Sequence, residues 1–150
     1  MSSDEETFRR LAVELRILEG TAEALQSRIN LVRAALTELR VASMTLEGVE
    51  KEKKNASLFV PIGGGSYVKA KLDSAEEVIV GIGADVAVER TMKEARENLE
   101  NRIAELAKTG NTLGQQLNDV IGKIGEHRSE LEGVTAKLRE RERTSGVRKT

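Results

Sequence analysis

Two glycine-containing segments are the places where this 150-residue chain could bind a phosphate group. Gly81-Ile82-Gly83 follows the apolar run Val78–Val80, much as the first turn of a dinucleotide-binding domain follows its first strand. Val86 stands where that turn has its third glycine, and a β-branched side chain there would obstruct close helix packing. Gly63-Gly64-Gly65 is not followed by the Gly-Lys-Ser/Thr of a phosphate loop. We therefore predict structural turns at both places and no nucleotide cofactor.

The only histidine, His127, is the remaining candidate for chemistry, because imidazole can act as a metal ligand or a general base. Either role needs partners, such as a second histidine or an acid at ligand spacing. Its neighbours in the sequence, Arg128 and Glu130, do not supply such a set. We interpret His127 as a polar residue on a helical seam, and predict no metal and no catalytic residue. The chain is expected to be a binding or scaffold protein and not an enzyme.

The composition agrees with a helical scaffold. Charged residues make up 33% of the chain and nearly balance at a net charge of −1, which suits solvated helix faces and gives no case for nucleic acid. Aromatic residues are only 2%, as a narrow helical seam allows, and without cysteine there is no disulfide framework. The acidic start of the chain does not resemble a signal peptide, and no run approaches the length of a membrane span. We expect a cytoplasmic protein without a membrane partner.

Two long ladders of apolar residues set the elements that carry these segments. The first advances in alternating steps of three and four residues and runs through Phe8, Leu11, Leu15, Leu18, Ala22, Leu25, Ile29, Val32, Leu36 and Leu39. The second runs through Met92, Ala95, Leu99, Ile103, Leu106, Gly110, Leu113, Leu117, Val120, Ile124, His127, Leu131, Val134 and Leu138. A repeat of about 3.5 residues keeps one seam facing a partner helix, so each ladder predicts a coiled-coil helix.

The similar lengths of the two helical runs predict that they fold back on each other as an antiparallel hairpin. The first helix is expected to start at Ser3, whose spacing to Glu6 matches a capping box, and to end between Gly48 and Asn55. The predicted fold class is α+β and mostly α, a long antiparallel coiled-coil hairpin with a central β insert. The expected parts are a coiled-coil helix over 1–54, two β hairpins over 55–89, and a coiled-coil helix with a basic tail over 90–150.

The central insert has the character of β structure. Short β-type runs alternate with the turns Gly63–Gly65, Asp73–Glu76 and Gly83–Asp85, which predicts two β hairpins. A piece of about 30 residues is too small to bury a sufficient core, and its open edges invite pairing with other chains. We expect the hairpins of several subunits to join in a common oligomeric body. The side chains expected to form it are Val60, Ile62, Tyr67, Val68, Val78, Val80, Ile82 and Val86.

The second helix carries two further features. Glycine has about 1 kcal/mol less helix propensity than alanine, so this arm is expected to be softer than a regular coiled coil. Its glycines are Gly110, Gly114, Gly122, Gly125 and Gly133. A mildly basic tail follows, which either aids solubility or contacts an acidic partner. Its basic residues are Arg139, Arg141, Arg143, Arg148 and Lys149.

Phe59-Val60-Pro61-Ile62-Gly63-Gly64-Gly65-Ser66-Tyr67-Val68-Lys69-Ala70 and the segment from Val78 to Glu89 resemble the α-class subunit of archaeal prefoldin. The order of helix, two hairpins and helix extends the resemblance over nearly the whole chain. It implies an ATP-independent chaperone in which two α-class and four β-class subunits join their hairpins into a double β-barrel. It also implies six coiled coils whose tips hold unfolded proteins and deliver them to a group II chaperonin.

Within that frame, we expect clients to bind at the open end of the coiled coil, where helices fray and pairing is looser. The side chains expected to contact clients are Phe8, Leu11, Leu15, Leu131, Val134 and Leu138. Two alternatives remain open. One is a filament-forming structural protein of the same fold, whose β body polymerises and does not close. The other is an unrelated coiled-coil adaptor, which predicts no effect on unfolded proteins.

Overall fold

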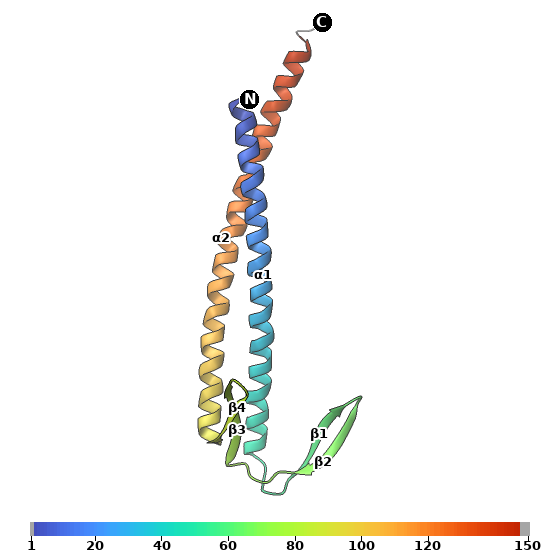
Figure 1. Ribbon diagram of the computed structural model, residues 1–150, viewed down its shortest axis with the longest axis vertical. Helices are drawn as coiled ribbons and strands as arrows, with labels where there is room; N and C mark the ends of the chain where they lie inside the picture. The colour runs from blue at the N-terminus through green and yellow to red at the C-terminus, as the bar shows by residue number, and fades with distance from the viewer. Residues whose placement is uncertain (1, 148–150) are drawn as a thin grey trace. The chain divides into compact units, whose positions relative to one another are not determined.

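The computed structural model describes residues 2–147 and confirms the predicted order of elements (Figure 1). The elements are α1 (Ser3–Glu50), β1 (Ser57–Gly63), β2 (Ser66–Lys71), β3 (Glu77–Gly83), β4 (Val86–Thr91) and α2 (Met92–Val147). They form two compact units. The first, the outer unit, contains the described residues up to Val32 and those from Thr109 onward. The second, the inner unit, spans Arg33–Lys108 and contains both hairpins.

In the outer unit, α1 and α2 lie antiparallel along the predicted seam. Asp4 Oδ2 lies 3.5 Å from an Arg141 Nη atom, and Glu19 Oε1 lies 3.0 Å from one of Arg128, so the order of partners on the two helices is reversed. Of the two ladders, every described member except Phe8 is buried or half-buried along the chain. The heptad pattern is therefore satisfied by helix pairing within one chain, as the sequence predicts.

Both helices begin at side-chain caps, and α1 begins at Ser3 as the sequence predicts. The cap of α1 is Ser2 and not Ser3, because the amide of Glu5 donates to Ser2 Oγ at 3.3 Å. Ser2 and Glu5 have the same spacing as Ser3 and Glu6, so the motif alone could not choose between them. At the start of α2, Thr91 and Glu94 form a reciprocal capping box, in which each side chain accepts from the amide of the other at 3.2–3.3 Å.

The inner unit holds the base of the coiled coil and the two hairpins. Met92 and Ala95 are buried where α2 begins, and Arg96 pairs with Glu50 at the end of α1. The amide of Met92 donates to the Glu76 carbonyl at 2.8 Å. These contacts join the first turn of α2 to the last turn of α1 and to the segment that enters β3.

The two hairpins are separate two-stranded antiparallel sheets built on one plan. Val60 pairs with Val68 in the first and Val80 with Val88 in the second, and each register shifts just before the turn, at Gly63 and Gly83. These two glycines have φ values of +103° and +108°. Residues with a side chain rarely adopt this backbone conformation, whereas glycine tolerates it because it has no Cβ. Both hairpins therefore use a glycine bulge to enter a two-residue turn with positive φ.

The α2 helix is continuous through all five glycines predicted to soften it. Gly110 has a packing role, because a Cβ placed on it would lie 3.2 Å from Val32 Cγ1 across the seam. In the tail, Arg141 pairs with Asp4 of the same chain, and Arg139 and Arg143 are exposed. Arg148 and Lys149 lie outside the described residues. Over residues 2–147, neither helix has a stretch both long and apolar enough to cross a membrane.

Candidate interaction surfaces

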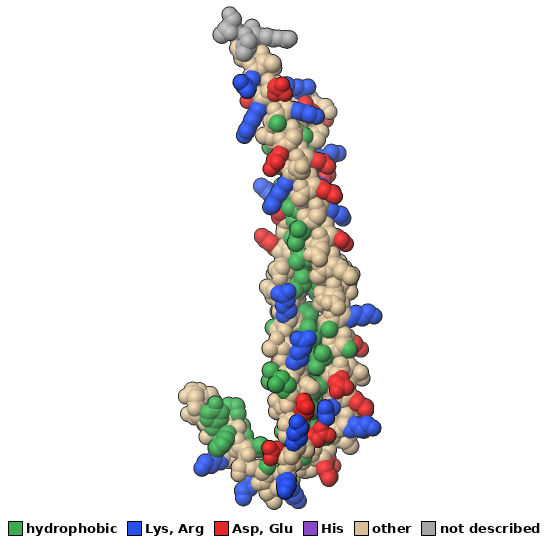
Figure 2. All heavy atoms as spheres, turned by 180° about the vertical axis from the view of Figure 1, so that it is seen from behind, with side chains coloured by type: hydrophobic (Ala, Val, Ile, Leu, Met, Phe, Trp, Pro, Cys, Tyr) green, Lys and Arg blue, Asp and Glu red, His purple; other side chains and the backbone are tan. Residues whose placement is uncertain are grey.

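The β1–β2 hairpin exposes apolar side chains on both of its faces. The predicted assembly residues Val60, Ile62, Tyr67 and Val68 are all exposed, and Figure 2 shows hydrophobic side chains gathered on this hairpin. Along the helices, the same view shows charged side chains of both signs. Because exposed apolar clusters of this kind mark interaction sites, β1–β2 is the clearest candidate for a contact with another subunit.

The β3–β4 hairpin has one covered face and one open face. Val78, Val80 and Val88 are half-buried, while Ile82 and Val86 are exposed near the turn. A groove of about 330 Å³ separates β3 from the helices; Leu46 of α1 and Leu99 of α2 line it together with the strand. Of the predicted assembly residues, Val78 and Val80 are thus already half-buried by contacts within their own chain.

Two of the most exposed apolar side chains on the strands were missing from the predicted assembly set. Phe59 is 68% exposed and Ile79 is 75% exposed. Both occupy the strand face opposite to the predicted residues Val60 and Val80, because successive side chains in a strand alternate. The signal was present in the sequence, since large apolar residues occur at adjacent positions in both strands, which is typical of a strand buried on two sides.

An acidic pair lies on the open face of β3–β4. Glu77 and Glu89 occupy diagonal positions, since Glu77 pairs with Thr91 and Ile79 pairs with Glu89. The hydrogen bond between the two carboxyl groups, followed by their mutual repulsion, raises the pKa of Glu77 above its ordinary value. Protonation of one carboxyl group therefore favours the hairpin.

The predicted client residues lie together at the end of the outer unit where α1 begins and α2 ends (Figure 1). They are not equally accessible. Leu11 is only 2% exposed, Phe8 is 36% exposed, and Leu15, Leu131, Val134 and Leu138 are half-buried in the seam. A client protein can reach Leu11 only if the two helices separate there. The role of these six residues in client binding therefore stays a prediction.

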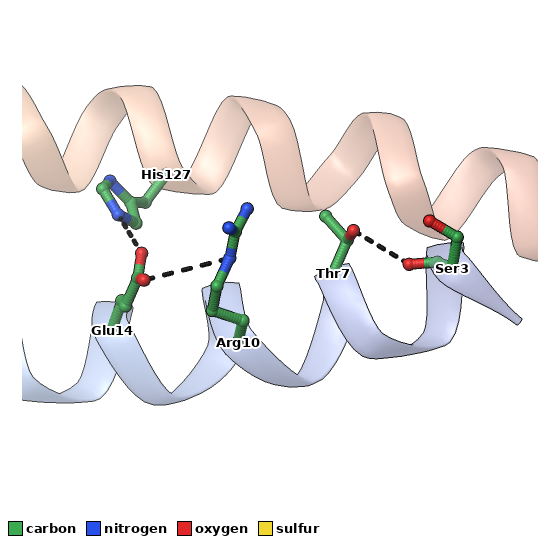
Figure 3. Close-up of polar contacts among 5 residues, drawn as sticks. All are labelled: Ser3, Thr7, Arg10, Glu14 and His127. Carbon is green, nitrogen blue, oxygen red and sulfur yellow. Dashed lines mark hydrogen bonds and ion pairs between the residues drawn. The ribbon is translucent and has the colours of Figure 1, made fainter. Parts of the chain in front are cut away.

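His127 has a partner that its sequence neighbours do not reveal. Its Nε2 atom lies 2.8 Å from Glu14 Oε2, a residue 113 positions earlier on α1, and its Nδ1 atom lies 2.8 Å from the Lys123 carbonyl oxygen (Figure 3). His127 is a half-buried polar residue on the seam, as expected, and the acid beside it comes from the other helix and not from its sequence neighbours. Within residues 2–147, no group of three acidic, histidine or cysteine side chains could hold a metal ion.

The glycine segments have the structural role that the sequence predicts. Gly81 lies within β3 and Gly83 forms its bulge, and the chain continues into strand β4 and not into a helix. Gly64 and Gly65 form the turn between β1 and β2, with φ values of +58° and +74°. Neither segment provides amides at a helix N-terminus, the arrangement on which dinucleotide-binding turns depend.

The sequence of this chain is similar to those of known proteins. Residues 18–137 match the family model described as prefoldin subunit. The prefoldin subunit alpha of Methanobrevibacter smithii is 31% identical over 133 residues, covering 87% of this chain and 90% of that protein. The one from Methanosarcina barkeri is 36% identical over 120 residues, covering 78% and 83%. Thus the sequence likeness spans helices and hairpins alike.

Two solved structures share the fold. A subunit of filamentous prefoldin from Methanocaldococcus jannaschii superposes with a TM-score of 0.66 at 24% identity, covering 77% of this chain and 95% of that one. The prefoldin beta subunit from Thermococcus strain KS-1 superposes with a TM-score of 0.57 at 17% identity, covering 84% and 90%. With its family model matched over most of its length and relatives more than 30% identical, this chain belongs to the prefoldin family of chaperone subunits.

Proposed function

We propose that this chain is the α-class subunit of an ATP-independent holdase, assembled through its β hairpins and binding unfolded proteins at its coiled-coil tip. The observation that carries the proposal is the contrast in apolar exposure. Apolar side chains on both hairpins are exposed, while the ladder residues of the helices, except Phe8, are buried or half-buried. The hairpins therefore need partner subunits, and the tip is where the seam can most easily open.

The partner subunits are proposed to be β-class prefoldin chains, two α with four β, in a closed hexamer. The two relatives at 31% and 36% identity that carry the name prefoldin subunit alpha support the α assignment. The structural likeness to a prefoldin beta subunit supports a shared hairpin geometry through which the two classes can pair. Mass measurement of the chain co-expressed with a β-class subunit from the same source tests this; open-ended fibres in light scattering would contradict it.

Unfolded and nascent proteins are the proposed clients, and a group II chaperonin the proposed recipient. Holding a client needs apolar contact without a fixed shape, which a frayed helix pair provides. The residues proposed to contact clients remain Phe8, Leu11, Leu15, Leu131, Val134 and Leu138. Because both glycine segments serve as hairpin turns, client protection is expected to be the same with and without ATP.

Removing the tip tests where clients bind. Deleting residues 1–12 together with 134–150 leaves both hairpins and the seam between residues 13 and 133, so the assembly is expected to keep its mass less the deleted segments. Suppression of citrate synthase aggregation is expected to fall sharply, because most of the predicted client residues are lost. Full protection by the truncated assembly would show that clients bind elsewhere.

A further inference from the structure

One polar contact interrupts the apolar seam of the outer unit. His127 occupies a ladder position between Ile124 and Leu131 on α2, and Glu14 lies between Leu11 and Leu15 on α1. Figure 3 shows the His127 ring reaching across from α2 to the Glu14 carboxylate. The pair therefore lies at the inner edge of the apolar residues assigned to client binding, and beyond it the two helices are also joined by the ion pair between Arg141 and Asp4.

Both ring nitrogens of His127 face oxygen atoms that can only accept hydrogen bonds. The Nδ1 atom lies 2.8 Å from the Lys123 carbonyl oxygen, and the Nε2 atom lies 2.8 Å from Glu14 Oε2. Neutral imidazole carries one N–H, so it satisfies one contact and sets a lone pair against the other oxygen. Only the doubly protonated imidazolium donates to both, and the geometry thus selects the charged ring.

Of the charged groups around the ring, the two carboxylates favour the charged ring, while Arg10 competes for one of them. From α1, Glu14 faces the ring directly, and Arg10 Nε lies 3.9 Å from its other carboxylate oxygen. From α2, Glu130 adds a further negative charge. The hydrogen bond to Glu14 is the main cause that raises the pKa of His127, and the Lys123 carbonyl adds to it, while partial burial acts in the opposite direction.

We propose that the His127–Glu14 pair is a proton-dependent clamp, which holds the tip closed when the ring is charged and lets the helices part when it is neutral. This regulation rests on the proposed function of the tip. The folded chain binds the proton more tightly than the unfolded chain, so the clamp stabilises the tip at low pH and loses this effect as pH rises through the folded pKa. Exposure of Leu11 and Leu15 is therefore expected to increase with pH.

The chain offers a direct measurement, because His127 is its only histidine. In the full-length chain labelled with ring-¹³C histidine, its NMR signal reports the titration without assignment. The midpoint is expected above the ordinary value of about 6.5, and Glu14→Gln is expected to lower it. A wild-type midpoint at or below the ordinary value would overturn the proposal, as would a midpoint that Glu14→Gln leaves unchanged.

Amide hydrogen exchange, corrected for its intrinsic pH dependence, tests the opening itself. Exchange over residues 8–18 and 124–138 is expected to become several-fold faster on passing the His127 midpoint. His127→Gln is expected to abolish that pH step. Arg128→Gln is the matched control, because it breaks the neighbouring cross-helix pair with Glu19 but leaves the titrating ring in place. It should accelerate exchange at every pH and keep the step; a step that survives in His127→Gln would overturn the clamp.

Client capture separates this proposal from the function on which it rests. Client capture by the wild type and by His127→Gln is measured at the same set of pH values. Because both proteins meet the client in the same protonation state at each pH, the difference between them does not depend on the client's own titration. Wild-type capture is expected to rise relative to the variant above the midpoint. If tip deletion leaves capture unchanged while the clamp still opens, the clamp stands and the tip function fails. If capture needs the tip but exchange shows no pH step, the clamp fails and the tip function stands.

Discussion

The two β hairpins share one backbone plan but differ in how much of each is covered by the rest of the chain. In β3–β4, three valines on one face are half-buried, and a groove lies between β3 and the helices. In β1–β2, only Leu58 and Ala70 near the base are half-buried. The first hairpin therefore depends on other subunits for almost all of its burial, while the second is partly anchored by its own chain.

An aspartate in the first hairpin should separate assembly from folding, and this is the largest expected effect. Val68→Asp on β2 is expected to abolish the oligomer, because an unpaired carboxylate in an apolar interface costs several kcal/mol. The helical signal of the chain should persist, since Val68 is 49% exposed within it. Native mass spectrometry and circular dichroism measure the two outcomes. Val13→Asp on α1, at a valine that is 61% exposed, is the matched control and should assemble normally.

The corresponding change on the anchored hairpin should behave differently. Val80 is half-buried on the covered face of β3, so Val80→Asp is expected to lower the free energy of unfolding of the chain itself by about 1–3 kcal/mol, as well as weakening assembly. Thermal denaturation of the two aspartate variants compares them. Equal melting temperatures would contradict the difference in burial between the hairpins.

The parts of this fold that local pattern encodes could be predicted from the sequence. The two helices follow from their ladders, because a seam repeats in the chain itself. The hairpins follow from β-type runs that end in glycine turns. Strand β4 runs to Thr91, beyond the expected end of the hairpins at residue 89. Its last residues are polar, but they pair with Glu77–Ile79 and so continue the sheet.

The parts that depend on long-range placement could not be predicted. The contact between Glu14 and His127 joins residues 113 positions apart, so only the exact register of the two helices reveals it. The covering of Val80 but not of Ile79 depends on which face of β3 turns toward the helices, and alternation alone leaves both choices open. Phe59 and Ile79 are a different case, because the large apolar residues at adjacent positions in both strands already indicated burial on two faces.

The turns of the two hairpins differ in strain, with an expected effect of about 1 kcal/mol. Ala84 and Asp85 have φ values of +51° and +58°, where an L-residue such as alanine is disfavoured by about 1–2 kcal/mol, whereas Gly64 meets no such penalty at +58°. Ala84→Gly is therefore expected to raise the melting temperature, and Gly64→Ala to lower it. Space is available for the added Cβ at Gly64, so its effect reports backbone strain alone. A loss of stability in Ala84→Gly would contradict this account.

The smallest expected effect concerns the acidic pair that only the second hairpin carries. The pKa of Glu77 is raised by its contact with Glu89, so the folded hairpin holds this proton more tightly than the unfolded chain. The stabilisation is present at low pH and is lost as pH rises through the folded pKa. Glu77→Gln keeps a hydrogen-bond donor and removes the repulsion at every pH. We expect it to raise the melting temperature slightly at neutral pH and to leave it unchanged well below the ordinary carboxyl range. Glu97→Gln, at an exposed position on α2, is the control for removing one negative charge, and an equal rise in both variants would show that net charge and not the pair is responsible.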